Sequence, residues 1–334
     1  MSDLTVSVSP HIHSGATTNR IMRDVLIALV PALVASVIIF GARSALVVLV
    51  SIFTCVFCEW IFQKAMKKPV TIMDCSAAIT GVLLAYNLPS TIPLWQAVFG
   101  GATAIILVKQ LFGGLGKNFA NPAITARIIM FLAFSVAMTT GMQTVDAATS
   151  AASINGVTSV TVIDGISSAT PLTLLAKGAT DELPSLIDMF LGLRGGSLGE
   201  TSMLALLLGG IYLIVRRVIT WHAPVALIAT VFVFTAVLGQ NPVYHILSGG
   251  LVLGAIFMAT DYVTAPQTSS GRLIFGIGAG FFTVLFRVYG SFPEGVSFAI
   301  LLMNILTPYI NRFTQSKPLG TVVPGDREVR QPEK

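Results

Sequence analysis

Apolar residues along this chain occur in ten long runs, separated by short polar connections and by one long polar segment. The runs cover residues 25–40, 45–62, 72–88, 94–112, 122–138, 202–215, 224–238, 246–259, 273–288 and 296–310. A helix that crosses a hydrocarbon core of about 30 Å needs roughly 20 residues, and most of these runs approach that length. Backbone groups inside a bilayer must also bond internally. The pattern predicts an all-α integral membrane protein with about ten transmembrane helices.

The long polar segment divides the chain into two halves of five runs each. Within it, residues 183–193 are apolar but short, and they include Asp188, so we expect this stretch to lie at the membrane interface. The predicted parts are an N-terminal segment at 1–24, a first five-helix repeat at 25–138, a loop at 139–201, a second five-helix repeat at 202–310 and a tail at 311–334.

The two halves share landmarks in the same order. The first half has Gly81, Pro93, Lys109, Gly113 and Ala123, and the second has Gly254, Pro266, Arg287, Gly290 and Ala299. Because a five-helix unit crosses the membrane an odd number of times, the second copy must enter from the opposite side. The pattern therefore predicts an inverted repeat, an architecture whose sites lie at the junction of the repeats on short or broken helices. The third and eighth runs carry such interruptions, at Asp74, Asn87, Pro89, Asp261 and Pro266.

Composition agrees with this interpretation. Hydrophobic residues make up 54% of the 334 positions and charged residues only 10%, against about 25% charged in a soluble domain. Residues 1–23 are polar and end in charge, so no cleavable signal peptide is expected there. The net charge of +5 comes from Lys and Arg residues distributed among loops, which argues against nucleic acid as a partner.

The distribution of basic residues predicts the orientation, because Lys and Arg accumulate in cytoplasmic loops. With the N-terminus inside, the cytoplasmic face receives Arg20, Arg23, Lys64, Lys67, Lys68, Lys109, Lys117, Arg127, Arg216, Arg217, Arg272, Arg312, Lys317, Arg327, Arg330 and Lys334. The other face receives Arg43, Lys177, Arg194 and Arg287. Both termini are thus predicted to be cytoplasmic and the long loop extracytoplasmic.

The long loop contains a candidate phosphate site. In the run D-G-I-S-S-A-T-P-L, residues 164–172, Thr170 precedes Pro171, the order of an N-cap hydroxyl followed by proline at the first helical position. A phosphate on that hydroxyl would sit at a helix N-terminus, which favours negative charge. By spacing alone, an ordinary helix cap is the favoured interpretation of Thr170.

Among the charged residues within or beside the apolar runs, the candidates for function are Glu59, Asp74, Arg127 and Asp261. A charge at the centre of a membrane helix costs about 2.5–3.5 kcal/mol on insertion scales, so such residues are candidates for function. Asp74 and Asp261 occupy comparable places in the two repeats and could bind a cation along an ion path. The alternatives for both are interfacial anchoring and helix capping.

Cysteine and histidine spacing predicts no metal site and no disulfide framework. Cys55 and Cys58 form C-x-x-C inside an apolar run, without a second pair, and are interpreted as small buried residues. The other residues of these types are Cys75, His11, His13, His222 and His245.

Three stretches together resemble the RnfD and NqrB family, the flavin-carrying membrane subunits of ion-pumping NADH or ferredoxin oxidoreductases. Residues 164–172 are similar to the recognition sequence of the transferase that joins FMN to a threonine by a phosphoester. Residues 113–123, G-G-L-G-K-N-F-A-N-P-A, are similar to the family's G-x-N-x-x-N-P-A segment near a second flavin. Residues 257–266, F-M-A-T-D-Y-V-T-A-P, are close to F-M-A-T-D-P-V-T-x-P, with Tyr262 replacing Pro. The resemblance covers nearly the whole chain, and the chain length favours RnfD.

The resemblance implies a covalent FMN on Thr170. The family pattern maps onto Asp164, Ser167, Ser168 and Ala169, with Ser168 where glycine is commoner. Residues 14–18, S-G-A-T-T, look like a second acceptor, but His11 stands six residues before Thr17 where the pattern has Asp. The charge distribution also places them in the cytoplasm, so we interpret them as flexible N-terminal sequence.

The resemblance also implies a second flavin, riboflavin or FMN, near Asn118 and Asn121. Their amides could hydrogen-bond the pyrimidine edge of a flavin, and the alternative is a polar loop before Pro122. The implied fold is a 5+5 inverted repeat like that of NqrB and resembling urea transporters.

The function expected from this resemblance is that of a subunit of a redox-driven translocase, not catalytic on its own, in a prokaryotic inner membrane. It would relay electrons between ferredoxin- and NAD-linked partners, coupled to Na⁺ or H⁺ movement. The chain has no G-x-G-x-x-G and no cysteine-rich cluster, so the other Rnf subunits (A, B, C, E and G) would handle ferredoxin and NAD. The alternatives are an NqrB-like subunit of a Na⁺-pumping NADH:quinone reductase and a channel or secondary transporter without redox function.

Overall fold

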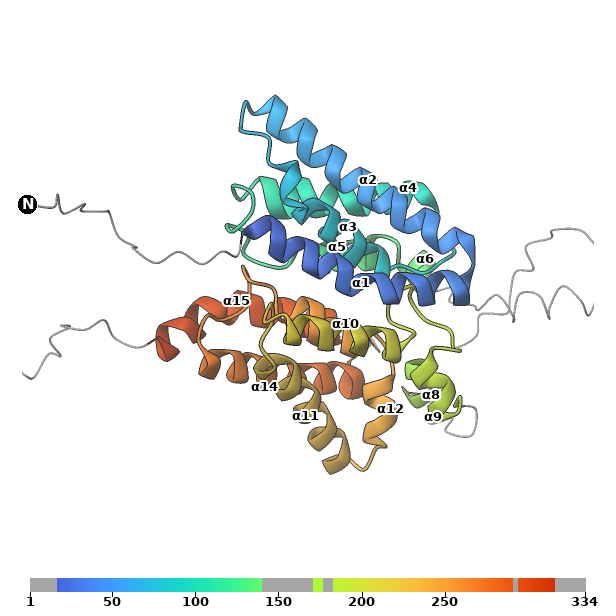
Figure 1. Ribbon diagram of the computed structural model, residues 1–334. Coiled ribbons are helices and arrows are strands. Elements are labelled where there is room, and N and C mark those ends of the chain that lie inside the picture. Colours follow the sequence, from blue (N-terminus) through green and yellow to red (C-terminus); the bar gives the residue numbers. More distant parts are fainter. Residues whose placement is uncertain (1–16, 140–170, 177–182, 291–293, 316–334) are drawn as a thin grey trace, which may run out of the picture.

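The computed structural model describes residues 17–139, 171–176, 183–290 and 294–315. Every regular element in these ranges is a helix, and the longer helices run side by side across the view in Figure 1. The first half contains α1 (Thr18–Phe40), α2 (Ala42–Ala65), η1 (Ile72–Asp74), α3 (Ser76–Tyr86), α4 (Leu94–Ala102), the π-helical η2 (Thr103–Gln110), α5 (Pro122–Ala133) and α6 (Ser135–Thr139).

The second half follows two short helices, α8 (Pro171–Ala176) and α9 (Leu186–Leu191). It contains α10 (Met203–Val215), α11 (His222–Val237), α12 (Pro242–Leu247), α13 (Leu251–Leu253), the π-helical η4 (Gly254–Met258), α14 (Ser269–Tyr289) and α15 (Val296–Thr314). The prediction of an all-α chain is confirmed for the described residues.

Local sequence explains where many of these helices begin. Asn121 and Asn241 each accept hydrogen bonds from the first turn of the helix that follows, and each precedes a proline at the first helical position. Ser202 and Thr268 cap α10 and α14 in the same way through their hydroxyls. The hydroxyl of Thr17 caps α1, so this threonine of the 14–18 segment has a structural role.

Helices lie in all ten predicted apolar segments, but they differ in length. Four of them, α1, α2, α14 and α15, are long and apolar enough to cross a membrane, while α3, α5, α10 and α11 are shorter apolar helices of 10–17 residues. The third and eighth segments are not single helices. In the third, Cys75 takes a left-handed conformation (φ 63°) between η1 and α3, and in the eighth Gly249 does so (φ 64°) between α12 and α13. The count of ten crossings stays a prediction.

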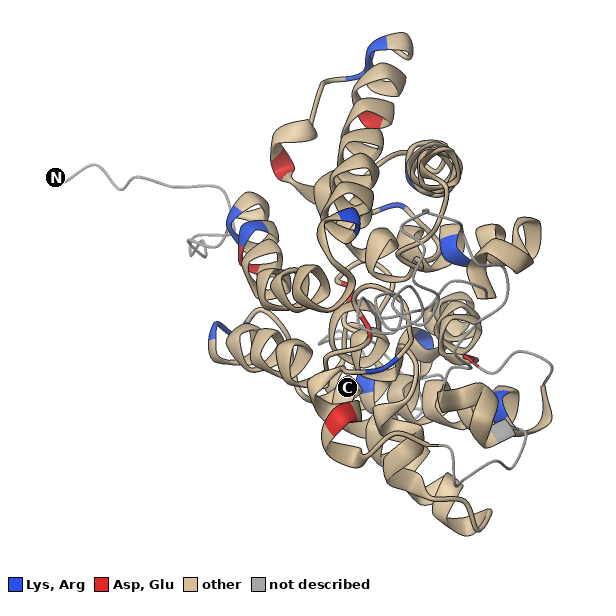
Figure 2. Ribbon diagram, turned by 90° about the vertical axis from the view of Figure 1, so that its right-hand side faces the viewer, with Lys and Arg blue, Asp and Glu red and all other residues tan. Residues whose placement is uncertain are grey.

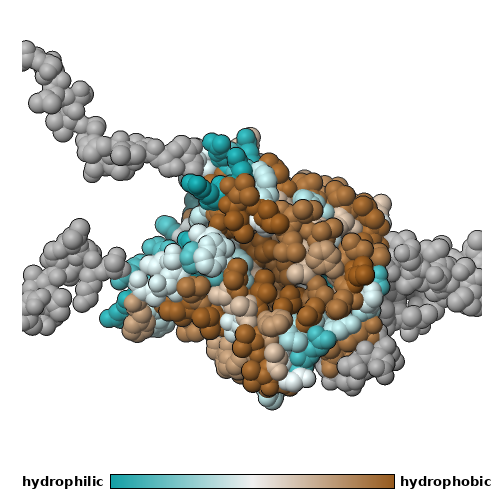
Figure 3. All heavy atoms as spheres, turned by 60° about the horizontal axis from the view of Figure 1, so that its bottom comes forward, coloured by the Kyte–Doolittle hydropathy of each residue, from teal (hydrophilic) through white to brown (hydrophobic). Residues whose placement is uncertain are grey.

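The surface of the helical body is suited to lipid. Figure 3 shows a broad hydrophobic surface across one face, with hydrophilic residues gathered toward its edges. Large apolar side chains on several helices point outward, among them Ile38 (76% exposed), Phe53 (69%) and Val237 (78%). Charged residues are few and scattered over the described ribbon (Figure 2). An exposed apolar surface of this kind, together with the long apolar helices, identifies a multi-pass membrane protein.

The two halves meet through helices that hold the same rank in each. The first helices, α1 and α10, pack on each other, and so do the last helices, α5 and α15. The first contact is close: a Cβ on Gly209 of α10 would lie 2.1 Å from the carbonyl oxygen of Ala28 in α1. Contacts between equivalent helices are what a two-fold relation produces. The inverted repeat itself stays a prediction.

Candidate functional site

A pocket opens at the junction of the two halves. The first half contributes α1, α3, η2 and the start of α5, and the second contributes α10, η4 and residues 260–263. Its walls are mostly apolar, with Ile79, Leu83, Leu115, Leu213, Ile219 and Phe257 among them, and the cavity volume is about 90 Å³. An apolar lining with a few polar groups is typical of a site for a small organic ligand or cofactor. The junction is where sequence reasoning placed a site.

Asn118 and Asn121 both line this pocket, but their side chains differ in what they already bind. The Asn121 Oδ1 accepts hydrogen bonds from the backbone amides of Ala123 (3.0 Å) and Ile124 (3.3 Å), so it caps α5. The Asn118 Oδ1 is shielded from solvent and has no hydrogen-bond partner among the described residues. A buried acceptor without a partner costs free energy unless a ligand satisfies it. Asn118 is therefore the better candidate for a ligand contact.

Asp261 also lines the pocket, from the connection between η4 and α14. Burial raises the pKa of its carboxyl, while hydrogen bonds from Thr264 and from the backbone amides of Val263 and Tyr262 oppose that shift. The neighbouring Tyr262, which stands where the family pattern has proline, donates its hydroxyl proton to the carbonyl of Val218. This contact ties the connection to the segment between α10 and α11.

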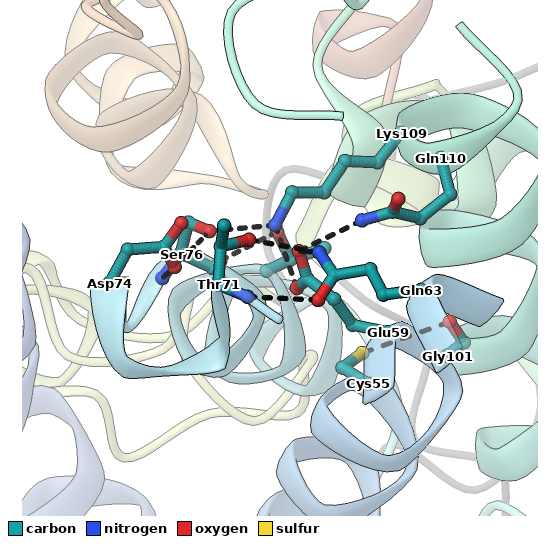
Figure 4. A network of polar contacts seen from close by, with 10 residues as sticks. Cys55, Glu59, Gln63, Thr71, Asp74, Ser76, Gly101, Lys109 and Gln110 are labelled. Carbon is teal, nitrogen blue, oxygen red and sulfur yellow. Dashed lines mark hydrogen bonds and ion pairs between the residues drawn. The ribbon is translucent and has the colours of Figure 1, made fainter. Parts of the chain in front are cut away.

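A buried polar network adjoins the pocket, and Figure 4 shows it from close by. We call it the Glu59 network; it consists of Glu59, Gln63, Ser76, Lys109 and Gln110. The Lys109 Nζ lies 2.8 Å from the Glu59 Oε2 and 2.6 Å from the Ser76 Oγ. The Glu59 Oε1 accepts further hydrogen bonds from Gln110 (2.9 Å) and Gln63 (3.3 Å). Sequence reasoning singled out Glu59 but missed Lys109 as a site residue, although a cation inside an apolar run was the available signal.

Asp74 caps the start of α3 and does not line the pocket. Its Oδ1 accepts hydrogen bonds from the Ser76 backbone amide (2.8 Å) and hydroxyl (2.6 Å). Helix capping was one of the two alternatives for Asp74, and the geometry favours it. Through Ser76, the cap also fixes the hydroxyl that Lys109 contacts.

A second group of charged residues, all buried except the half-buried Glu294, lies toward the opposite ends of the long helices. We call it the arginine cluster; it consists of Arg127, Arg194, Glu200, Arg287 and Glu294. Arg127 forms an ion pair with Glu294 and lies 4.0 Å from the carboxylate of Glu200. Arg194 donates to the backbone carbonyl of Glu200 (3.0 Å). Burial lowers the pKa of the Arg194 guanidinium, and the nearby Glu200 carboxylate opposes that shift.

Arg287 completes the arginine cluster through backbone contacts. Its guanidinium donates to the carbonyls of His245, Ser248 (3.0 Å) and Glu294 (3.4 Å). The first two carbonyls belong to the last turn and the end of α12, so Arg287 satisfies groups that a helix C-terminus leaves open.

Arg127 belongs to the arginine cluster, whose other two arginines the charge distribution assigned to the opposite face. Its partners are Glu294 and Ser297 (2.7 Å), at the start of α15. Arg127 lies five residues after Pro122, about 7.5 Å along α5, and its long side chain reaches further still. The face at which it lies stays a prediction.

The acceptor sequence lies outside the described residues, with Thr170, Asp164, Ser167, Ser168 and Ala169 all in that part. The described chain resumes at Pro171, and residues 171–176 form α8. Leu172 is buried, and its Cδ1 would contact a Cβ built on Gly249, between α12 and α13. The residues that follow the acceptor sequence are therefore packed beside the arginine cluster.

The cysteines and histidines do not contribute to the pocket. Cys55, Cys58 and Cys75 are free thiols, and only Cys55 is fully buried. Among the described residues, no group of three or more His, Cys, Asp or Glu side chains is arranged to hold a metal ion. His245 is buried with neither ring nitrogen hydrogen-bonded, and His222 stacks on Trp221. His11 and His13 lie outside the described residues.

A family model described as NQR2, RnfD, RnfE family matches residues 5–320. The chain belongs to this family. It is 45% identical over 322 residues to the D subunit of the Na⁺-translocating ferredoxin:NAD⁺ oxidoreductase complex of Acetobacterium woodii, covering 95% of this chain and 96% of the relative. It is 41% identical over 336 residues to the D subunit of the proton-translocating complex of Clostridium ljungdahlii, with the same coverage. The D subunit of an ion-translocating oxidoreductase complex from Stutzerimonas stutzeri is 38% identical over 328 residues, which cover 91% of this chain and 93% of the relative.

Proposed function

We propose that this chain is the flavin-carrying membrane subunit of an Rnf-type ion-translocating oxidoreductase, with FMN esterified to Thr170. It relays electrons between ferredoxin- and NAD-linked partner subunits, and the relay is coupled to Na⁺ or H⁺ movement. The observation that carries the proposal is the match of nearly the whole chain to the D subunits of such complexes, at up to 45% identity among the relatives named above.

The covalent flavin is supported by the acceptor sequence and by the helix that follows it. Asp164, Ser167, Ser168, Ala169 and Thr170 match the transferase pattern, and residues 171–176, which follow them, are helical. A covalent bond would keep the coenzyme attached even where its loop faces water. Flavin supplies the redox chemistry, and the protein supplies position and electrostatics.

We assign a second, dissociable flavin, riboflavin or FMN, to the pocket at the junction because of the chemistry of its lining. Apolar walls suit the ring, and the unpartnered Asn118 Oδ1 offers an acceptor for a ring N–H. Asn121 would hold the pocket wall rather than bind, because its Oδ1 is committed to the cap of α5. Lys109 and Asp261 are the charged residues that line the pocket within the described chain.

The partners follow from the relatives' names, which describe subunits of a multi-subunit complex. The Rnf subunits RnfA, RnfB, RnfC, RnfE and RnfG would complete the electron path, and a flavin transferase would load Thr170. Moving one charge against a membrane potential of about 100 mV costs roughly 2.3 kcal/mol. The transfer of one electron between redox centres whose potentials differ by about 100 mV releases the same free energy. Asp261, on the wall of the pocket, stays the candidate for an ion path, and Asp74 is a weaker one because it caps α3.

The test is in-gel flavin fluorescence of the full chain after denaturing electrophoresis, using material from a host that has the transferase. We expect a fluorescent band for the wild type and a dark band for Thr170→Val. Thr17→Asn is the matched control, because asparagine keeps the N-cap of α1 while removing the hydroxyl of the second S-x-A-T sequence. This control should stay fluorescent.

A dark wild-type band would favour a channel or secondary transporter, for which an inverted repeat is equally suitable. Fluorescence that persists in Thr170→Val and disappears in Thr17→Asn would move the acceptor to the N-terminal segment. Co-purification with iron–sulfur subunits that accept electrons from ferredoxin would favour the Rnf assignment over an NqrB-like one.

A further inference from the structure

We propose that Lys109 sets the charge that the junction pocket presents to its ligand, and that it raises the reduction potential of a flavin bound there. The inference rests on the proposed second flavin and adds to it a positioning pair, Glu59 and Lys109, with a measurable consequence.

The first observation is the direction of the buried ion pair. Lys109 is 2% exposed and Glu59 is fully buried, and their charged atoms are 2.8 Å apart. Lys109 lines the pocket, and Glu59 does not. The pair is therefore a dipole whose positive end faces the ligand space. A charge held there acts through a medium of low effective dielectric constant, where it is stronger than in water.

The second observation is that the network fixes the ammonium without using all of its donors. Glu59 accepts hydrogen bonds from Lys109, Gln110 and Gln63, so its carboxylate is well satisfied. Lys109 has three N–H donors, and the contacts that the described residues make with its Nζ are those to Glu59 and Ser76. One N–H donor therefore remains for a ligand acceptor, beside a pocket that also holds the unpartnered Asn118 Oδ1.

The third observation concerns the other charged group on the pocket wall. The Asp261 Oδ2 already accepts a hydrogen bond from the Thr264 hydroxyl (3.0 Å), whereas the Lys109 ammonium keeps a donor for a ligand. Lys109 is thus the charged group on the wall that is best placed to contact the ligand. A ligand that gains negative charge on reduction is stabilised more by this cation after reduction than before. The reduction equilibrium shifts toward the reduced ring, while the numbers of electrons and protons that the flavin takes up stay the same.

The π-helical segments suit this arrangement. Lys109 belongs to η2 and Phe257 to η4, and both residues line the pocket, one from each half. Such segments insert extra backbone into a helix turn and are frequent at functional sites. Here they bring a charged wall and an apolar wall to the same space.

The experiment measures the midpoint potential of the dissociable flavin in the purified full-length chain. Thr170→Val is used as the background, so that any remaining flavin is non-covalent, and riboflavin or FMN is added in excess to fill the pocket. The test variant is Glu59→Gln with Lys109→Met, which removes both buried charges and avoids leaving one unpaired. The controls are Lys109→Arg, which keeps the charge, and Lys117→Met, which removes an exposed lysine from the adjacent loop.

We expect the double variant to bind oxidised flavin and to show a lower midpoint potential. A shift of at least tenfold in the reduction equilibrium is expected, equivalent to about 59 mV for one electron. Lys109→Arg and Lys117→Met should stay close to the wild-type potential. A merely structural ion pair would change stability and leave the potential where it was.

Two results would overturn the inference while leaving the second flavin in place. One is a double variant that binds flavin at the wild-type potential. The other is a folded double variant that takes up no flavin even in excess. Lys109 would then be needed to bind the oxidised flavin, and it would not act by stabilising the reduced form more strongly. A wild-type chain that holds no acid-releasable flavin would instead refute the second flavin itself.

Discussion

The Glu59 network and the arginine cluster occupy related places in the two halves but are built differently. Each contains a cation at the break before the short third helix: Lys109 beside Cys75 and Ser76, and Arg287 beside Ser248 and Gly249. Lys109 contacts the hydroxyl that begins the following helix, whereas Arg287 contacts carbonyls that end the preceding one. The comparison shows that a repeat can keep the position of a charge while changing what the charge does.

The two regions also differ in how completely their polar groups are paired. In the Glu59 network every charged group has a partner of opposite charge or a hydrogen bond, and the two charges cancel. The arginine cluster has three arginines against two glutamates. Several of its buried atoms lack hydrogen bonds among the described residues, including the Arg194 Nε and the Glu200 Oε2. We therefore expect the network to be sensitive to single charge removal and the cluster to be sensitive to lost backbone contacts.

The largest effect is expected for Lys109→Met alone. It leaves the fully buried Glu59 without its cation, and removing one partner of a buried ion pair typically costs about 3–5 kcal/mol. The free energy of unfolding in detergent, measured by chemical denaturation, should fall by that amount. Glu59→Gln combined with Lys109→Met should recover most of the loss. Equal instability of the single and double variants would show that packing of the lysine stem, not charge, sets the cost.

A smaller loss is expected for Arg287→Met. The substitution leaves the carbonyls of His245, Ser248 and Glu294 without their donor, and an unsatisfied buried acceptor costs about 1–3 kcal/mol. Arg287→Lys should recover only part of this, because an ammonium cannot reproduce the planar fork of a guanidinium. Thermal unfolding of the full chain measures both variants. Full recovery by lysine would mean that charge, rather than hydrogen-bond geometry, is what the arginine cluster needs at this position.

The apolar runs predicted the helices well, because a backbone inside lipid must form its hydrogen bonds internally and therefore becomes helical. Polar residues and prolines predicted that the third and eighth runs are interrupted, but not that the left-handed residues would be Cys75 and Gly249, because such a residue leaves little trace in hydropathy. The pocket residues Asn118, Asn121 and Asp261 were found separately from motifs and intramembrane charge. That they share a pocket, together with Lys109, depends on packing between halves that are far apart in the chain. The ion pair of Arg127 with Glu294 was not predicted, because the position of a residue along α5 does not determine where its long side chain ends.

Substitutions of the two pocket asparagines should have different effects, one on stability and the other on flavin binding. Asn121→Ala removes the N-cap of α5 and should lower the free energy of unfolding by about 0.5–2 kcal/mol. Asn118→Ala removes an acceptor that has no partner among the described residues, so it should cost little stability. It should instead weaken binding of the dissociable flavin by about fivefold to tenfold. Denaturation and flavin titration on both variants provide the measurement, and a reversed pattern would exchange the roles of the two residues.

The smallest effect is expected for Tyr262→Phe, which tests how much the pocket depends on the hydrogen bond between Tyr262 and Val218. The hydroxyl of Tyr262 donates to the Val218 carbonyl, and a typical hydrogen bond of this kind contributes about 0.5–1.5 kcal/mol. Phenylalanine keeps the ring, so the connection after η4 should stay in place and flavin content should be unchanged. Loss of flavin from this variant would mean that the connection bearing Asp261 is held chiefly by this bond. In the completeness of its hydrogen bonding, the pocket would then resemble the arginine cluster more than the Glu59 network.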